Sequence, residues 1–362
     1  MSWRAWAETA TGAIRAAGRW RIPRAVGPEG PVVFASNDYL GLTRHPAVIA
    51  AAHAALDRWG AGSGSARLIV GSRGVHHELE AELAEWRGMP RAAIFPTGFA
   101  ANLGVLTTVG THGTLICSDE LNHASIIDGC RLARAETRIY RHGDLDHLDA
   151  ILGDRGDRRA VVVSDTVFSM DGDRADVGSL IDLCARHDAL LVLDEAHAVL
   201  GPDVDPGEAP VLRVGTLSKT LGALGGFVAG PTAFIELLEN AARPYIFTTA
   251  PTPADTAAAL AALRVLRSPE GGALTARLRG LVERVRPGHP SPIIPFVVGD
   301  EEAALVASAA LAARGLLVPA IRPPTVAPGT SRLRVTLSAA HTDPEVDALV
   351  VALADIHGSL TR

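Results

Sequence analysis

Residues 211–229 of the 362-residue chain read VLRVGTLSKTLGALGGFVA. The stretch predicts a short strand at 211–214, a glycine-rich turn, and a second short strand at 227–229. Of the 34 lysine and arginine residues in the chain, all but Lys219 are arginine. Arginine stays protonated in proteins, whereas a lysine amine can lose its proton and act as a nucleophile. We therefore interpret Lys219 as a lysine that forms a Schiff base. The alternative is a surface lysine in an arginine-biased chain.

Short apolar runs alternate with longer, helix-periodic stretches from residue 92 to residue 229. No two-residue hairpin turns separate the runs, and most of them are too short to be helices. This alternation predicts an α/β fold in which a mainly parallel, seven-stranded sheet is covered by helices on both faces. The predicted strands are residues 92–95, 114–117, 138–140, 160–163, 190–193, 211–214 and 227–229.

The two ends of the chain have a different pattern. The N-terminal part predicts a helix over 3–20, a strand over 31–34 and a helix over 46–59 that Pro46 opens. After residue 253 an alanine-rich helical stretch precedes a mixture of strands and helices. We expect strands at 294–298, 316–320 and 332–337, together with two helices.

This organisation predicts three parts. They are an N-terminal helix and arm (1–35), a large domain (36–252), and a linking helix with a smaller α+β domain (253–362).

Composition excludes several classes of function. A net charge of −6 gives no reason to expect a nucleic-acid partner. Cys117, Cys130 and Cys184 form no CxxC pair, so we expect small buried side chains and neither a disulfide frame nor a metal site. The first 20 residues lack the apolar core of a signal peptide, and no apolar run is long enough to span a membrane. We expect a cytoplasmic protein.

Polar residues follow several of the predicted strands. Ligands of open α/β sheets bind outside the carboxyl ends of the strands. Residues 97–102 (TGFAAN) predict a helix start whose backbone N–H groups suit a phosphate. His123 follows the next strand, and Asp194 and His197 follow the strand at 190–193. Four aspartates in 165–176 lack EF-hand spacing, so we expect a solvated turn there and no cation site.

The DEAH sequence at 194–197 allows two very different interpretations. One is the nucleotide-hydrolysing box of helicases, which requires a phosphate-binding GxxxxGK[ST] loop. That interpretation fails, because Ser218 precedes the sole lysine and the lysine follows the DEAH. The other is a pyridoxal 5′-phosphate (PLP) site. PLP needs a carboxylate at the pyridine nitrogen, a lysine at the aldehyde, a group over the ring and a phosphate turn.

The order and spacing of these elements resemble the α-oxoamine synthases, a branch of the fold-type-I PLP enzymes, which have an aspartate-aminotransferase-like fold. The likeness covers nearly the whole chain. The segments that carry it are SNDYLGL (36–42), TGFAAN (97–102), NHAS (122–125), VFSMDGD (167–173), DEAH (194–197), TLSKTLG (216–222) and GTSRLRVTLSAAH (329–341). Within the family, IRPPTV (321–326) is most similar to the biotin-pathway branch.

The resemblance implies a role for each matching position. Lys219 would be the Schiff-base lysine, Asp194 the partner of the pyridine nitrogen, and His123 the residue stacked on the ring and active in catalysis. The other implied positions are His197 and Ser169 at the phenolic oxygen, Gly98, Phe99 and Thr216 at the phosphate, Arg334 at the amino-acid carboxylate, and Arg19 and Thr325 on the acyl side.

The resemblance also implies the reaction and the assembly. The reaction is the decarboxylative condensation of L-alanine with a pimeloyl thioester of CoA or acyl carrier protein. The family is usually a homodimer, so Thr248 or Thr249 would reach the partner's phosphate. Two alternatives stay open: a relative that uses another amino acid or acyl donor, such as those that make 5-aminolevulinate or 2-amino-3-oxobutyrate, and a non-catalytic PLP-binding subunit. Residues 62–71 and 201–207 are shorter than the family's pattern.

Overall fold

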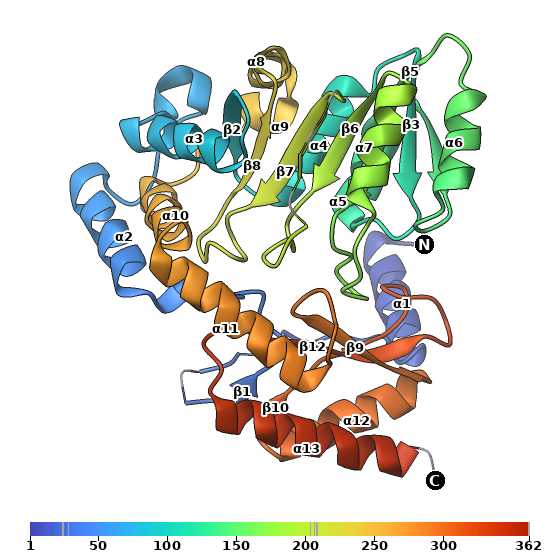
Figure 1. The fold of residues 1–362 in the computed structure, drawn as a ribbon. Helices are drawn as coiled ribbons and strands as arrows, with labels where there is room; N and C mark the ends of the chain where they lie inside the picture. The colour runs from blue at the N-terminus through green and yellow to red at the C-terminus, as the bar shows by residue number, and fades with distance from the viewer. Residues whose placement is uncertain (24, 28, 203, 206, 208, 361–362) are drawn as a thin grey trace.

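The computed structural model describes residues 1–23, 25–27, 29–202, 204–205, 207 and 209–360, the last four as backbone only (Figure 1). Part of the short segment at 201–207 and Arg24 therefore lie outside the described residues. No helix in the described part of the chain is long and apolar enough to cross a membrane. No cluster of metal-ligating side chains is present among the same residues.

A seven-stranded sheet forms the centre of the larger unit and confirms the predicted α/β class. Its strand order is β2-β8-β7-β6-β5-β3-β4. All neighbours are parallel except β8, which runs antiparallel to both β2 and β7. The strands are β2 (Arg91–Phe95), β3 (Thr114–Asp119), β4 (Glu136–Tyr140), β5 (Arg159–Asp165), β6 (Ala189–Asp194), β7 (Val211–Thr216) and β8 (Gly226–Gly230).

Helices cover both faces of this sheet, so strands β3, β6 and β8 are buried along their whole length and are mostly apolar. Side chains of α4, α5, α8 and α9 pack on one face around Phe95 and Val192. Helices α6 and α7 pack on the other face around Leu115 and Leu191, and α3 and α10 continue that layer toward β2 and β8. The helices are α1 (Trp3–Ala16), α2 (Pro46–Trp59), α3 (Gly74–Trp86), α4 (Gly98–Val109), α5 (Ala124–Leu132), α6 (Leu145–Gly153), α7 (Val177–Arg186), α8 (Thr232–Ala241), α9 (Arg243–Ile246), α10 (Pro253–Leu266), α11 (Pro269–Val285), α12 (Glu301–Ala313) and α13 (Asp343–Leu360), with a 3₁₀ turn at Leu42–Arg44 and a π-helical turn at Arg67–Gly71.

A smaller unit follows α10 and α11, which lead from the large sheet to the C-terminal elements in Figure 1. Its three-stranded sheet has the order β11-β12-β9 and is antiparallel. The strands are β9 (Ile293–Gly299), β11 (Ala320–Ile321) and β12 (Ser331–Thr336). Helices α12 and α13 are the two that the sequence predicts here.

Two predicted elements near the chain ends differ from the structure. The strand predicted at 316–320 is two strands in two sheets: β10 (Leu316–Leu317) pairs with β1 (Val32–Val33), and β11 pairs with β12. Pro319 lies between them and has no N–H for a ladder, so the chain changes partners at that point. The predicted helix at 3–20 ends at Ala16, because Gly18 takes a left-handed conformation (φ 66°) that terminates it.

A buried ion cluster ties the carboxyl end of β6 to β7 and α3. The Glu195 side chain is fully buried and accepts two hydrogen bonds from Arg213, at 3.0 Å from Nε and 2.6 Å from Nη2. Arg87 Nε lies 3.2 Å from the other Glu195 oxygen, and Arg213 Nη1 donates to the Arg87 carbonyl. Because Glu195 directly follows Asp194, the cluster fixes the strand end at which the candidate site begins.

We expect Glu195→Ala to destabilise the fold by about 3–5 kcal/mol, because the substitution leaves two buried guanidinium groups without their carboxylate. Urea denaturation of the purified protein measures this. Glu85→Ala is the matched control, since Glu85 also pairs with an arginine (Arg267) but on an exposed surface. Equal stabilities of the two variants would contradict the role given to the cluster.

Candidate active site

The carboxyl ends of β3, β5, β6 and β7 surround a cavity of about 260 Å³ together with the start of α4. These strand ends lie at one edge of the sheet because the strands are parallel and in register. Asp165 at the end of β5 lies opposite Asp194 at the end of β6. The cavity is lined by Thr97, Gly98, Phe99, Asn102, His123, Ser125, Asp165, Asp194, Ala196, His197, Thr216, Ser218 and Lys219.

Lys219 lies in a tight loop between β7 and β8. The loop is closed by hydrogen bonds from Leu217 N to the Gly225 carbonyl and from Gly222 N to the Lys219 carbonyl. Gly222 has φ 60°, and a Cβ there would lie 2.6 Å from Thr43 N, so glycine is required for the close approach of the two segments. The loop directs Lys219 Nζ to within 3.1 Å of His197 Nε2.

A line of polar contacts continues from Lys219 to Arg334. His197 Nδ1 lies 2.5 Å from the hydroxyl of Tyr39, and that hydroxyl donates to Asn37 Oδ1 at 3.2 Å. Arg334 Nη2 donates to the same Asn37 oxygen at 3.3 Å, and Arg334 Nε donates to the Ser169 carbonyl at 2.6 Å. Arg334 is therefore connected to Lys219 through Asn37, Tyr39 and His197.

Asp194 is held by two donors. Asn102 Nδ2 donates to Asp194 Oδ2 at 2.6 Å, and the backbone N–H of Ala196 donates to Asp194 Oδ1 at 2.9 Å. Asn102 Nδ2 also donates to Ser125 Oγ, which lies 2.8 Å from His123 Nδ1. One amide group thus connects the carboxylate to the residue that fixes the His123 ring.

Asp165 is a correction to the solvated turn predicted over 165–176. It is only 3% exposed, and its Oδ2 accepts the backbone N–H of His123 at 2.8 Å. Burial, and then the neighbouring Asp194 carboxylate, raise the pKa of Asp165 well above its ordinary value. The prediction failed because the carboxylate closes a strand that is buried on both faces, which sequence spacing does not show.

The basic groups of the cavity lose charge on burial. Burial lowers the pKa of Lys219, although Asp194 and Asp165 act against the shift. Burial, and then the positive charge of Lys219, lower the pKa of His197 well below its usual range. Burial likewise lowers the pKa of His123. Near neutral pH the two imidazoles are therefore neutral, and the lysine gives up its proton more readily than an exposed one.

The start of α4 supplies a second polar wall. Thr97 caps this helix by accepting the Ala100 N–H, which leaves the amides of Gly98 and Phe99 at the cavity. A Cβ on Gly98 would lie 3.2 Å from Thr216 Cβ, so the helix start packs closely on β7. Free N–H groups of a helix N-terminus favour an anion.

Five sets of predicted residues do not line this cavity, and the first is Arg334, which contacts Asn37 and the Ser169 carbonyl instead. Ser169 is half-buried and contacts Arg334 through its carbonyl. Arg19 is exposed, 3.8 Å from Glu301, and Thr325 is exposed on the smaller unit. Thr248 and Thr249 follow α9, where Thr249 pairs with Ala66.

The contacting residues Tyr39, Asn102 and Asp165 are among those that received no role from the sequence. Two of them lie inside the segments SNDYLGL and TGFAAN, so the signal was present in the sequence. Their partners, however, are 92 to 158 residues away along the chain. Only tertiary structure pairs them.

Comparison with known proteins agrees with this geometry. The pattern of the aminotransferase class I and II family matches residues 29–353. The chain belongs to this family. It is 50% identical over 340 residues to the 8-amino-7-oxononanoate synthase of Methylobacterium nodulans. The aligned region covers 90% of this chain and 87% of that protein.

Solved structures of the family have the same fold. The serine palmitoyltransferase of S. paucimobilis, solved with a bound PLP–myriocin aldimine, is 28% identical with a TM-score of 0.90, covering 98% of this chain and 97% of that one. An 8-amino-7-oxononanoate synthase from Francisella tularensis is 26% identical with a TM-score of 0.76, covering 91% and 98% of the two chains. The fold-type-I prediction is therefore confirmed.

The donor set of the cavity fits PLP. A carboxylate (Asp194), an amine of lowered pKa (Lys219) and an imidazole (His123) line one cavity with the start of a helix. These are the groups that a pyridine nitrogen, an aldehyde, a ring face and a phosphate each require.

In the protein freed of cofactor, we expect Lys219 to react with a small amine-modifying reagent. The rate should reach half its maximum below pH 10.5, which is the ordinary pKa of lysine. The lowered pKa leaves more neutral amine at a given pH, so reactivity appears earlier as the pH rises. Reductive methylation followed by mass spectrometry measures the rate, with the Met1 amino group as the exposed reference. Half-maximal reaction at or above pH 10.5 would contradict the effect of burial.

Proposed function

We propose that this chain is a PLP-dependent enzyme that condenses L-alanine with a pimeloyl thioester. The products are 8-amino-7-oxononanoate, carbon dioxide and the carrier thiol. The observation that carries the proposal is the meeting of Lys219, Asp194 and His123 in one cavity beside a helix N-terminus. The 50% identity to an 8-amino-7-oxononanoate synthase supports the same reaction.

The proposal gives each wall of the cavity one part of the cofactor. Lys219 Nζ would bind the aldehyde carbon, and Asp194 would hold a proton at the pyridine nitrogen. Gly98, Phe99 and Thr216 would receive the phosphate, and His197 would contact the phenolic oxygen, with Ser169 beside it. When bound, PLP supplies an electron sink for the α-carbon of the amino acid.

Lys219 would also move the proton. Its neutral amine would accept the proton from the α-carbon of alanine and later return it. The lowered pKa of Lys219 suits this role, since a base must be neutral at the working pH. Neutral His197, 3.1 Å away, can accept a hydrogen bond from the amine and orient it.

Arg334 and His123 would position the two substrates. Arg334 is 6% exposed and lies beside Asn37 and Tyr39, where a carboxylate would find a partly desolvated guanidinium. His123 Nδ1 is held by Ser125, so the ring's other nitrogen can face the thioester carbonyl. Arg19 and Thr325 stay predictions for the acyl side, because both lie outside this cavity.

A homodimer is part of the proposal. The π-helical turn at Arg67–Gly71 exposes Leu68, Ile69 and Val70 by 51%, 74% and 68%, and Phe247 is 68% exposed. The pairing of Ala66 with Thr249 places the two segments side by side, so they form one apolar patch. Thr248 and Thr249 at this patch would reach the partner's phosphate. The three-part division (1–35, 36–252, 253–362) and the cytoplasmic location stay predictions.

The first experiment is the visible spectrum of the protein with added PLP. We expect an absorption band that borohydride converts into a permanent attachment at Lys219, the sole lysine. Lys219→Ala and Lys219→Arg should both lose the band and the turnover, because neither side chain offers a neutral amine at this position. A wild-type protein that stays colourless with PLP would overturn the proposal, as would a turnover-competent Lys219→Ala.

The second experiment compares amino acids and thioesters. We expect alanine with pimeloyl thioester to give a higher kcat/KM than glycine with acetyl or succinyl thioesters. Steady-state kinetics with matched thioesters decides between this chain's proposed substrates and those of its relatives. A clear preference for glycine would move the chain to another α-oxoamine synthase activity, and no turnover with any pair would favour a non-catalytic subunit.

A further inference from the structure

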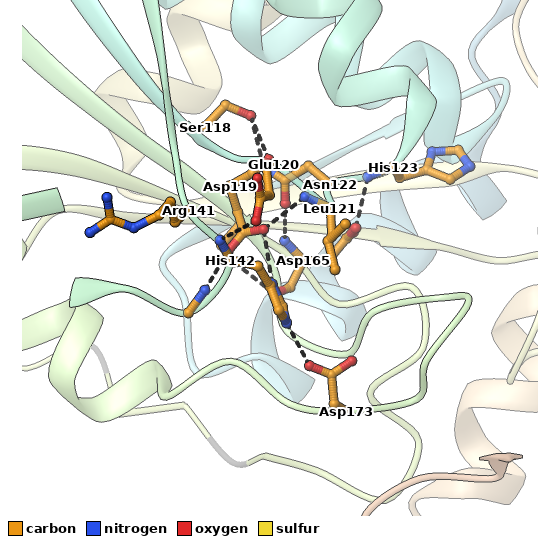
Figure 2. Close-up of polar contacts among 12 residues, drawn as sticks. Ser118, Asp119, Glu120, Leu121, Asn122, His123, Arg141, His142, Asp165 and Asp173 are labelled. Carbon is orange, nitrogen blue, oxygen red and sulfur yellow. Dashed lines mark hydrogen bonds and ion pairs between the residues drawn. The ribbon is translucent and has the colours of Figure 1, made fainter. Parts of the chain in front are cut away.

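His142 lies outside the cavity, between two aspartates that belong to different loops (Figure 2). It follows β4, the edge strand of the large sheet. Its Nδ1 lies 3.0 Å from Asp119 Oδ1, at the end of β3, and its Nε2 lies 2.8 Å from Asp173 Oδ2. Nothing in the proposed chemistry uses this histidine.

The Asp119 side of the contact leads to His123. Asp119 Oδ1 also accepts the N–H of Leu121, and its Oδ2 accepts the N–H of Gly143. This turn presents Asn122, whose amide donates to Ser118 Oγ and the Val163 carbonyl while its oxygen accepts Asp165 N–H.

His123 follows directly, and its backbone N–H donates to Asp165, as Figure 2 shows. Residues 119 to 123 therefore lie in one hydrogen-bonded network, which His142 contacts at Asp119 and Glu120.

The Asp173 side leads to Ser169 and Arg334. Residues 167–174 form a tight hairpin, in which Phe168 N donates to the Asp173 carbonyl and Gly172 N donates to the Phe168 carbonyl. The buried Phe168 ring meets the His142 ring edge-on at 4.4 Å. At the tip of the hairpin the Ser169 carbonyl accepts Arg334 Nε.

The hairpin also contacts the smaller unit. Ser291 Oγ donates to the Gly172 carbonyl at 2.7 Å, and Arg332 forms an ion pair with Asp171. On the large unit, Asp173 and Phe168 bind His142. The hairpin is thus fixed between the units, and the contact with His142 is its polar attachment to the β3–α5 loop.

The charge state of His142 suits a double attachment. Hydrogen bonds to Asp119 and then Asp173 raise the pKa of His142 to about 10, so both ring nitrogens carry protons near neutral pH and both can donate. The other charged groups nearby are Glu120, which accepts a hydrogen bond from the backbone N–H of His142, and Arg141, which pairs with Asp144.

We propose that His142 is a positioning residue: an imidazolium that joins the His123 loop to the Ser169 hairpin and so fixes two walls of the substrate site. The inference rests on the proposed function, since His123 and Arg334 are substrate-facing only within it. Loss of the His142 contacts would free His123 and the Ser169–Arg334 contact together. Lys219 and Asp194 would keep their own hydrogen bonds.

The test compares His142→Gln with His187→Gln in the PLP-loaded enzyme. Glutamine is neutral, and its two donor hydrogens share one nitrogen, so it cannot replace the two separate ring nitrogens that face Asp119 and Asp173. His187 offers a matched control, because it also contacts an aspartate (Asp149 Oδ1, 2.7 Å) but lies at the end of α7, away from both loops. Three quantities are measured: kcat and KM for alanine, the visible circular dichroism of bound PLP, and the melting temperature.

We expect His142→Gln to lower kcat on the order of 10- to 100-fold, as small misplacements of catalytic groups do, and to raise the KM for alanine. The visible circular dichroism should weaken while the absorption band at Lys219 remains. Asp173→Asn, which alters a half-exposed side chain, should shift the same quantities in the same direction. The double variant should lower kcat no further than the more damaging single variant does, because both substitutions remove the same contact between the two loops.

The inference is wrong if His142→Gln and Asp173→Asn both have the same kcat, KM and circular dichroism as His187→Gln. This holds even if their melting temperatures are lower. Should His142→Gln fail to fold, Asp173→Asn alone decides the matter by the same readouts. A wild-type enzyme without the visible band would refute the proposed function instead, before any variant is compared.

Discussion

The site depends on one constraint: parallel strands that are buried on both faces present polar groups to a ligand where they end. In this sheet the ends of β5 and β6 are in register, so Asp165 and Asp194 lie opposite each other at the same edge. Two buried carboxylates at adjacent positions repel and need donors. Asn102, the Ala196 amide and the His123 amide supply them, and each of these belongs to the wall of the same cavity.

Burial then sets the protonation of the site. Desolvation lowers the pKa of Lys219, His197 and His123 alike, so these three basic groups release their protons more readily than exposed ones. The contacts from Lys219 through His197, Tyr39 and Asn37 to Arg334 join the amine that would move the proton to the group that would hold the substrate carboxylate. The same line crosses from the large unit to the smaller one, so in the proposed function one set of hydrogen bonds would join the proton-transferring amine to the substrate-binding arginine.

Defined polar contacts also hold the loops around the cavity. The hairpin at 167–174 contacts His142 on one side and Arg332 and Ser291 on the other, so it transmits the position of the smaller unit to the His123 loop. The cluster of Glu195, Arg87 and Arg213 fixes the end of β6 in a similar way from the opposite side.

Much of this could be predicted from the sequence. The seven apolar runs became the seven strands, because a strand covered on both faces must be apolar and short. Lys219, Asp194, His123 and the helix start at 97–102 were predicted to share a site, because residues that follow parallel strands meet at one edge, and the structure brings them to one cavity.

Only the tertiary structure decided the partners. Tyr39 lies against His197, Asn102 against Asp194 and His142 against Asp173, and spacing along the chain carries no record of such contacts. The division of 316–320 between two sheets and the burial of Asp165 were mispredicted for the same reason. Composition and periodicity report which residues can be buried, whereas packing alone determines which buried group faces which.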